Sequence, residues 1–304
     1  MRDSFSTALV KLASDNKSLL LLTGDHGYSL FDEFRARFPD QYLNAGVAEQ
    51  NMVGMAAGLA RVGFRPIVYG LSAFVPIRTV EQIKLDITHD NLPVVLIGDG
   101  AGFVYSHLGT SHQSTEDIAC TRAIPGIVVL SPADRFEMTA CMEYAFSNNG
   151  PVYMRIGKSD VGDVHNEFDK SLIGRKLIKV FTGNDNLPGI IATGSMVYLS
   201  KKIGQEFSLN VWSAPIIKPM DKNHIIEICK ITNGLIVLEE HSIYGGLGSA
   251  IAEIVSENLP SKVFRIGVND KFSEKCGSYS YLLQEHLLDY QSVKQRVMKI
   301  ITSN

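Results

Sequence analysis

The sequence predicts an α/β fold with two consecutive open twisted sheets, each mostly parallel and flanked by helices. Short apolar runs that end in Gly or Pro alternate with longer segments of helical period, which is typical of βα units and parallel sheets. The chain has 304 residues, and at roughly 150 residues per domain this length indicates two domains that each bury a core. A polar stretch between the two series supports the same division.

The first series of elements fills residues 1–157. An apolar face that includes Phe5 and Leu9, behind a cap at Asp3, predicts the first helix, and another helix is expected over 134–146. The expected strands are short and apolar, and they cover 19–22, 42–45, 66–69, 94–97, 127–130 and 152–155.

Residues 158–188 form the expected linker, because they are polar and contain glycines such as Gly162 and Gly174. The second series covers 189–304. Its expected strands are 189–193, 209–212, 234–239 and 263–266, with helices that begin near Met196, Asp221 and Leu247 and a tail helix near 290–301.

Composition and charge exclude several classes of protein. Hydrophobic residues make up 45% and charged residues 20%, and a net charge of -3 provides no basic surface for nucleic acid or anionic lipid. No apolar stretch approaches the roughly 20 residues that a membrane helix needs. The N-terminus lacks the basic and apolar segments of a signal peptide, so we expect a cytoplasmic protein. Its 4 cysteines are far apart in sequence and are expected to be reduced and mostly buried.

Two glycine-rich turns have the composition of ligand sites. Gly98-Asp99-Gly100 follows a predicted strand, but neither a Rossmann fingerprint nor a Walker lysine accompanies it, so it is weak evidence for a phosphate or metal loop. The segment 245–249 precedes an apolar helix. It either presents backbone N–H groups to an anion or forms a tight turn with close helix packing, and we favour the turn.

The segment 42–60 carries a single acidic residue, Glu49, where a predicted strand meets a helix rich in Gly and Ala. So many small residues indicate that another backbone approaches this helix closely. A glutamate in a first turn also complements the helix dipole at a protein surface, and this simpler interpretation stays open.

A second polar group follows the strand at 94–97. Tyr105, His107, Ser111 and His112 lie within eight residues of one another in a loop without regular pattern. Open α/β sheets bind their ligands at the carboxyl ends of the strands, so two histidines here favour a functional site over simple solvation.

Together these segments resemble the transketolase family of thiamine diphosphate enzymes, over essentially the whole chain. The matching segments are Gly46-Val47-Ala48-Glu49-Gln50-Asn51-Met52, Ser72-Ala73-Phe74, Ser111-His112-Gln113-Ser114-Thr115-Glu116-Asp117 and Glu239-Glu240-His241-Ser242-Ile243-Tyr244-Gly245-Gly246. The resemblance implies a pyrimidine-binding domain at 1–157 and the family's C-terminal domain at 189–304.

The resemblance also implies how thiamine diphosphate would be bound. Glu49 matches the glutamate that hydrogen-bonds N1′ of the aminopyrimidine and promotes loss of the thiazolium C2 proton. Phe74 matches the aromatic residue that stacks on the pyrimidine, although its position before Pro76 would by itself indicate core packing. Gln50 and His26 are the further expected cofactor contacts.

For the substrate, His112 matches a histidine near the reacting carbons, where it is suited to proton transfer or to orienting hydroxyl groups. Arg155 resembles a phosphate-binding arginine, with a structural ion pair as the alternative. His107 and Ser29 complete the expected substrate-binding set.

Two departures from the family pattern bear on the substrate. Leu108 stands where the family usually has an Asp that contacts a sugar hydroxyl, and a further substrate histidine of the family falls near Gly100. A site that lacks such groups discriminates against substrates that need them, so we expect a modified sugar rather than a plain pentose phosphate. His107 and His26 are the expected replacements.

In the family, an additional N-terminal domain holds the diphosphate and Mg²⁺ through a GDG turn and a downstream Asn. The resemblance does not extend to that domain, and residues 103–128 contain no Asn, so we expect that this chain lacks the domain and carries no metal ligands. A separate N-terminal transketolase-like subunit is expected to supply them in an α2β2 heterotetramer.

The predicted reaction is transfer of a two-carbon ketol or acyl unit from a ketose or 2-keto acid donor to an aldehyde or ketone acceptor. One alternative is the E1 β subunit of a 2-oxoacid dehydrogenase, which has the same subunit division. Another is a non-catalytic regulatory subunit of the same fold.

Overall fold

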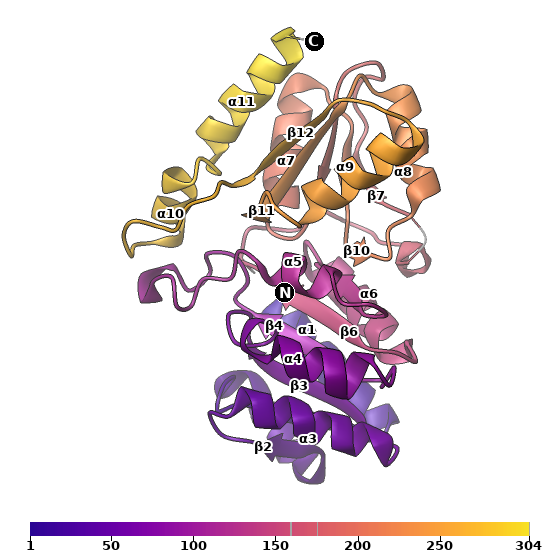
Figure 1. The fold of residues 1–304 in the computed structure, drawn as a ribbon, viewed down its shortest axis with the longest axis vertical. Coiled ribbons are helices and arrows are strands. Elements are labelled where there is room, and N and C mark those ends of the chain that lie inside the picture. The colour runs from indigo at the N-terminus through magenta and orange to yellow at the C-terminus, as the bar shows by residue number, and fades with distance from the viewer. Residues whose placement is uncertain (159, 175, 304) are drawn as a thin grey trace.

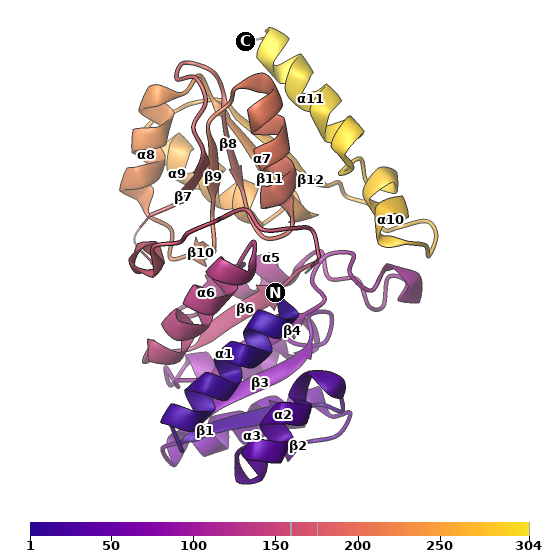
Figure 2. The same cartoon turned by 180° about the vertical axis from the view of Figure 1, so that it is seen from behind.

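The computed structural model describes residues 1–158, 160–174 and 176–303, and it consists of two layered α/β units that meet end to end (Figures 1 and 2). Positions 159 and 175 of the expected linker, and residue 304, lie outside the described residues. The predicted fold class, α/β with two mostly parallel sheets flanked by helices, is confirmed.

The first sheet has seven strands in the order β10-β5-β6-β4-β3-β1-β2. All its neighbours pair in parallel except β10, which runs antiparallel to β5 at one edge. The strands are β1 (Leu19–Thr23), β2 (Tyr42–Asn44), β3 (Arg65–Leu71), β4 (Val95–Asp99), β5 (Val128–Leu130), β6 (Val152–Ile156) and β10 (Ile216–Lys218).

Alternation along these strands divides the interior of the first unit into two cores. Leu21 and Tyr69 belong to one core and Leu22 and Val68 to the other. The first core is covered by α1 (Arg2–Asp15), α2 (Asp32–Arg37) and α6 (Arg135–Ser147). The second is covered by α3 (Glu49–Arg61), α4 (Val80–Gln82), the wide helical turn Ile83–Thr88 and α5 (Asp117–Arg122).

The second sheet has five strands in the order β12-β11-β8-β9-β7, and only the edge strand β7 is antiparallel. These strands are β7 (Ile178–Phe181), β8 (Gly189–Ala192), β9 (Val211–Ser213), β11 (Leu235–Ser242) and β12 (Val263–Val268). One face packs on α7 (Met196–Phe207), α10 (Tyr279–Glu285) and α11 (Tyr290–Ser303), and the other on α8 (Lys222–Ile231) and α9 (Leu247–Asn258).

Two strands depart from the expected division into consecutive sheets. Strand β7 lies inside the segment expected to be a linker. Strand β10 leaves the second unit and pairs with the first sheet, where Ile216 lies opposite Leu130. Pro215 and Pro219 flank β10, and because proline lacks the N–H of a ladder hydrogen bond, such a strand is confined to a sheet edge.

The N-cap of helix α1 lies two residues before the expected cap at Asp3. Met1 is the N-cap, so Asp3 lies in the first turn and not at the cap position. Its carboxylate there still complements the helix dipole.

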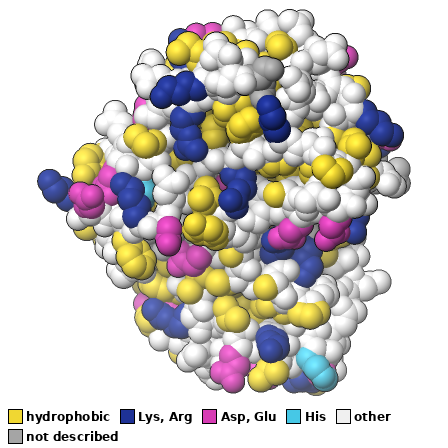
Figure 3. Space-filling view, turned by 45° about the horizontal axis from the view of Figure 1, so that its top comes forward, with side chains coloured by type: hydrophobic (Ala, Val, Ile, Leu, Met, Phe, Trp, Pro, Cys, Tyr) yellow, Lys and Arg dark blue, Asp and Glu magenta, His cyan; other side chains and the backbone are white. Residues whose placement is uncertain are grey.

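The surface carries charges of both signs. On the face shown in Figure 3, Lys and Arg side chains are interspersed with Asp and Glu and do not gather into one patch. Among the described residues, no helix has the length and apolar character needed to cross a membrane. The four cysteines are free, with Cys141 and Cys229 buried, Cys120 half-buried and Cys276 exposed.

Candidate active site

Glu49 is a buried carboxylate at the point where β2 passes into α3. It is the first residue of α3, and only 2% of it is exposed. Gly46 has a φ of +72°, which is open to glycine at little cost and lets the chain turn between the two elements. Because Glu49 is buried, complementing the helix dipole at a surface does not account for it.

The contacts of Glu49 satisfy only half of its carboxylate. Arg78 donates from Nη1 to Oε2 over 2.8 Å, while Nε2 of His26 lies 4.0 Å from Oε1. Within the described part of the chain, Glu49 Oε1 and His26 Nε2 have no hydrogen-bond partner. A buried carboxylate oxygen without a donor is costly, so this atom is suited to a hydrogen bond from a bound molecule.

The ring of Phe74 has the other side chains of this site around it. The Arg78 guanidinium carbon is 4.2 Å from the ring centroid. The ring of His112 meets Phe74 edge-on with centroids 5.3 Å apart, and His26 lies at 6.3 Å on centroids. We call these five residues the Glu49 cluster: Glu49, His26, Phe74, Arg78 and His112.

Apart from Glu49, the cluster comes from three loops at the carboxyl edge of the first sheet. His26 follows β1, Phe74 and Arg78 follow β3, and His112 follows β4. Parallel strands deliver their following loops to one edge, so side chains far apart in sequence meet there. Ser111 Oγ lies 3.0 Å from Nδ1 of His112 and fixes the orientation of that ring.

Four of the predicted site residues therefore meet in one place, and the others lie outside the cluster. Gln50 is exposed, and its Nε2 donates to the backbone oxygen of Arg78 over 3.4 Å. Ser29 and His107 lie in the loops that carry His26 and His112, but they are exposed at 3₁₀ turns and have no hydrogen bond to the cluster among the described residues.

Arg155 lies in a buried ion pair of the first unit and also donates to the backbone of the second. Its Nε donates to Asp117 Oδ2 over 2.8 Å, and its Nη2 donates to the backbone oxygen of Glu240 over 3.2 Å. The residue is 4% exposed. This placement supports the structural ion pair that the sequence left open, and it leaves little of the guanidinium for a substrate phosphate.

Arg78 is the cluster residue that the sequence did not single out. Phe74 and Arg78 are four residues apart, and the backbone N–H of Arg78 donates to the backbone oxygen of Phe74 over 3.1 Å, which closes one turn. Side chains at this spacing lie on one face of a helical turn, so an arginine four positions after the matched Phe was an available signal.

The Gly98-Asp99-Gly100 turn is engaged within the chain. Asp99 Oδ2 accepts hydrogen bonds from Tyr69 at 2.8 Å and Tyr105 at 3.0 Å, and it forms an ion pair with Arg2 at 3.4 Å. A β-carbon on Gly100 would lie 2.0 Å from the ring of Tyr105. Tyr105 thus fills the space where a histidine at this position would stand.

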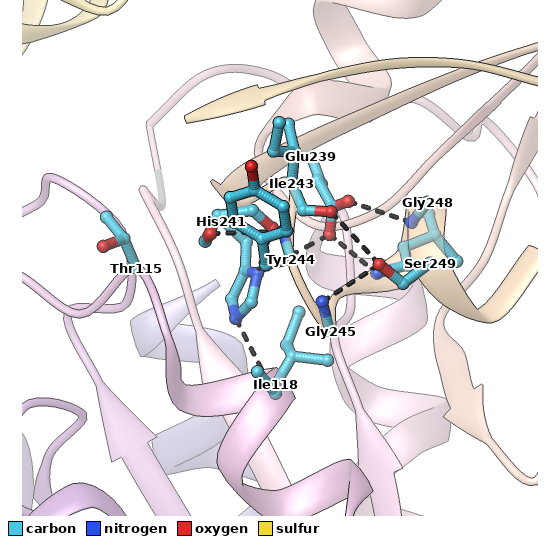
Figure 4. A network of polar contacts seen from close by, with 12 residues as sticks. Thr115, Ile118, Glu239, His241, Ile243, Tyr244, Gly245, Gly248 and Ser249 are labelled. Atoms are coloured by element: carbon cyan, nitrogen blue, oxygen red, sulfur yellow. Dashed lines mark hydrogen bonds and ion pairs between the residues drawn. The ribbon is translucent and has the colours of Figure 1, made fainter. Parts of the chain in front are cut away.

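The turn at 245–249 binds an anion, and that anion belongs to the chain itself. Glu239 accepts from the backbone N–H of Leu247 at 2.7 Å and of Gly248 at 2.9 Å, at the start of α9 (Figure 4). A β-carbon on Gly246 would lie 2.1 Å from Glu239 Oε2. The turn is therefore both a close packing contact and an anion site that is filled internally.

Neighbouring buried groups join the two units. His241 Nε2 accepts from the backbone N–H of Ala119 at 3.3 Å (Figure 4). Glu240 accepts from Phe103 N at 2.7 Å, from Tyr279 at 2.5 Å and from Ser195. Burial raises the pKa of Glu239 to about 7, against the hydrogen bonds from Gly248 and Leu247. Burial lowers the pKa of His241 to about 4.

Comparison with known families assigns both units. Residues 1–163 match the transketolase pyrimidine-binding domain, and residues 188–293 match the transketolase C-terminal domain. A solved structure described as a split-gene transketolase, inactive β4 tetramer, superimposes with a TM-score of 0.89 at 32% identity, covering 99% of this chain and 98% of that chain.

Curated relatives of similar length agree. A protein of Phocaeicola vulgatus named as a subunit of apulose-4-phosphate transketolase is 33% identical over 89% of this chain and 88% of its own length. A 6-deoxy-6-sulfo-D-fructose transketolase subunit of Clostridium sp. strain MSTE9 is 30% identical over 94% and 89%. The chain belongs to the transketolase family.

Proposed function

We propose that the chain is one subunit of a heteromeric thiamine diphosphate-dependent transketolase. The enzyme would transfer a two-carbon ketol or acyl unit from a ketose or 2-keto acid donor to an aldehyde or ketone acceptor. The observation that carries this proposal is the buried Oε1 of Glu49, which lacks a donor among the described residues. The arginine on the other oxygen of this carboxylate, Arg78, packs on the ring of Phe74. Relatives named as transketolase subunits support the same class of reaction.

The Glu49 cluster fits the aminopyrimidine half of thiamine diphosphate. Glu49 Oε1 would hydrogen-bond the pyrimidine, Phe74 would pack on its face, and His26 and Gln50 would line its edge. When bound, the cofactor supplies a carbon nucleophile at thiazolium C2. The Mg²⁺ and diphosphate ligands would come from the partner subunit, since the carboxylate of Asp99 is engaged by Arg2 and two tyrosines.

The chain's own residues would orient and move protons. Arg78 holds Oε2 of Glu49, so Oε1 is the oxygen that would be left to hold or accept a proton. His112 stands edge-on to Phe74, with its Nδ1 held by Ser111, and would present Nε2 to a substrate hydroxyl or carbonyl. The proposed roles of Glu49 and His112 both depend on fixed side-chain positions, and the contacts with Arg78, Phe74 and Ser111 hold these positions.

The partner is proposed to be an N-terminal transketolase-like subunit, in an α2β2 heterotetramer. Two facts support a partner: both of these relatives are named as subunits, and the related solved structure is described as an inactive β4 tetramer. Tyr28, Val47 and Leu108 are large apolar side chains exposed on loops near the cluster, where a second chain would cover them. We place the assembly in the cytoplasm, in keeping with four free cysteines.

For the substrate we propose a modified sugar. Leu108 offers no hydrogen bond from its side chain, and Tyr105 closes the position of Gly100, so two polar contacts to a plain sugar phosphate are missing. His107, exposed in the loop that carries His112, and His26 of the Glu49 cluster would supply the replacement contacts, with Ser29 as a further substrate contact. Relatives named for apulose 4-phosphate and 6-deoxy-6-sulfo-D-fructose support a ketose of this kind.

The test is co-expression with an N-terminal transketolase-like subunit from the same organism. The purified complex would be given thiamine diphosphate, Mg²⁺, ribose 5-phosphate as the acceptor and one donor from a panel: apulose 4-phosphate, 6-deoxy-6-sulfo-D-fructose, hydroxypyruvate or xylulose 5-phosphate. We expect a ketose lengthened by two carbons, with xylulose 5-phosphate the poorer sugar donor by about tenfold. Acylation of a lipoyl domain instead would identify an E1 β subunit, and no turnover of any donor would favour a regulatory subunit.

A further inference from the structure

The loop that carries His112 is closed at its base but has little regular structure within it. Gly102 and Ser114 form an antiparallel bridge, with backbone hydrogen bonds of 2.7 Å and 3.0 Å. Between them, the chain makes a short 3₁₀ turn at Ser106–Leu108. Figures 1 and 2 both show this turn projecting from the first unit beside α10 of the second.

A histidine of the second unit touches both ends of this loop. The ring of His286 stacks on Phe103 at the start of the loop, with centroids 4.7 Å apart and an interplanar angle of 22°. Its Nε2 lies 2.9 Å from Oγ of Ser273, and that hydroxyl donates to Oε1 of Gln113 over 2.9 Å. Gln113 is the residue directly after His112.

The direction of this chain of hydrogen bonds follows from counting protons. A hydroxyl has one hydrogen, and Ser273 gives it to Gln113, so Nε2 of His286 must be the donor to Ser273. His286 is 1% exposed, and burial lowers its pKa, so the ring is neutral with its proton on Nε2. His286 therefore holds Gln113 through the hydroxyl of Ser273.

Apolar packing alone is a poor explanation for these residues. Nδ1 of His286 and Nε2 of Gln113 are buried and lack hydrogen-bond partners among the described residues. Burying a half-satisfied polar group costs more than burying an apolar one of similar shape, so these side chains weaken the contact as a stability element. Directional hydrogen bonds instead fix where the backbone beside His112 lies.

We infer that His286, acting through Ser273 and Gln113, is a positioning residue for the loop that presents His112 to the substrate. The inference rests on the proposed function for the role of His112. It gives the second unit a part in the reaction, because the ring that stacks on Phe103 and the hydroxyl that holds Gln113 both belong to that unit.

Three variants of the full chain, each assembled with the partner subunit, test this role. His286→Phe keeps a ring to stack on Phe103 and removes the N–H. His286→Gln keeps a donor near the position of Nε2. His224→Phe is the matched control, because it removes a half-buried histidine that accepts from Leu177 N at 3.0 Å, away from the loop.

Hydrogen–deuterium exchange and steady-state kinetics are read together. We expect His286→Phe to speed exchange of amides 103–115 about tenfold and to lower kcat about tenfold, with thiamine diphosphate affinity unchanged. His286→Gln should restore both values, and His224→Phe should leave exchange in this segment as in the wild type.

Two results overturn the inference. One is wild-type exchange and kcat in His286→Phe. The other is equal loss in the Phe and Gln variants with faster exchange throughout the second unit, which would mean that His286 acts by packing. If the wild-type complex turns over no donor, the proposed function fails, while exchange of 103–115 still decides whether His286 holds the loop.

Discussion

Two buried glutamates in this chain differ in how completely their carboxylates are hydrogen-bonded. Glu240, between the two units, has both carboxylate oxygens hydrogen-bonded from within the chain, by Phe103 N on one side and by Ser195 and Tyr279 on the other. Glu49, at the carboxyl edge of the first sheet, has Arg78 on one oxygen and no hydrogen bond from the described residues on the other.

This difference in hydrogen bonding indicates a structural role for Glu240 and a ligand-binding role for Glu49. A buried charge whose hydrogen bonds all come from its own chain fixes how two units meet, and removing it leaves donors without an acceptor. A buried carboxylate with a hydrogen bond to only one of its oxygens destabilises the chain when it is alone. A ligand that donates to the other oxygen removes this destabilisation when it binds. Substitutions at the two sites should therefore differ in kind as well as in size.

The largest effect is expected from Glu49→Ala on turnover. Loss of the carboxylate removes both the hydrogen bond to the cofactor and the proton partner, so kcat/KM of the assembled complex should fall about 10³-fold. The free energy of unfolding of the chain alone should stay unchanged or rise, because a half-satisfied buried charge is gone. Steady-state kinetics and urea unfolding measure the two quantities.

Glu33→Ala is the control for this substitution, since Glu33 is an exposed first-turn glutamate of a neighbouring helix. It should leave both quantities at their wild-type values. Unchanged turnover in Glu49→Ala would remove the catalytic role and favour a regulatory subunit.

Glu240→Ala should have the next largest effect, and it should act on stability. The substitution leaves Phe103 N, Ser195 and Tyr279 buried without their acceptor, and we expect the free energy of unfolding to fall by about 3 kcal/mol. Chemical denaturation measures the loss. If the denaturation midpoint of Glu240→Ala equalled that of the wild type, the hydrogen bonds of Glu240 would not contribute to stability. The proposed contrast between Glu240 and Glu49 would then be wrong.

Arg78→Met sharpens the comparison from the side of the active site. The substitution retains an apolar stem over Phe74 and removes the hydrogen bond to Oε2 of Glu49. We expect kcat to fall about tenfold, because the carboxylate is then free to turn. Arg78→Lys should recover part of the lost kcat. A wild-type kcat in Arg78→Met would show that Arg78 does not orient Glu49.

The smallest effect concerns pH and the contact between the units. Burial lowers the pKa of His241 to about 4, so the unfolded chain takes up a proton as the pH falls below about 6.5 while the folded chain does not. Stability from this residue is thus present above pH 6.5 and is lost toward pH 4. Acidification from about pH 7.5 to 5.5 should cost the wild type about 1 kcal/mol relative to His241→Gln.

Thermal and urea unfolding of both proteins at the two pH values measures that difference. Using the difference is necessary because Glu239 titrates in the opposite sense: burial raises its pKa to about 7, and its contribution to stability is lost as the pH rises through that value. Equal pH dependence in wild type and His241→Gln would contradict a neutral His241.

The sequence supports prediction of those features that depend on local pattern. Apolar runs located most of the strands, and the position of His112 after a strand was enough to expect it at the carboxyl edge of the sheet. Phe74 and His26 were named only by the resemblance to the transketolase family, because neither has a local pattern that indicates a site. Strand β10 was not predicted, because a three-residue strand between prolines has no pattern of its own and forms only by pairing across units.

Side-chain partners were harder to predict than positions. Arg155 lies at the end of β6 as expected, yet its ion pair with Asp117 depends on how α5 packs, which no local spacing encodes. The same holds for Glu239, whose partners are amides at the start of α9. His286 carries no motif, and only the folded chain brings it to Phe103.

The central claim is that this chain holds one half of a cofactor site. A calorimetric titration of thiamine diphosphate with Mg²⁺ into the chain alone, and into the complex with the N-terminal subunit, tests it most directly. The account predicts no tight binding to the chain alone and tight, Mg²⁺-dependent binding to the complex that Glu49→Ala weakens. Tight Mg²⁺-dependent binding and turnover by the chain without any partner would contradict it.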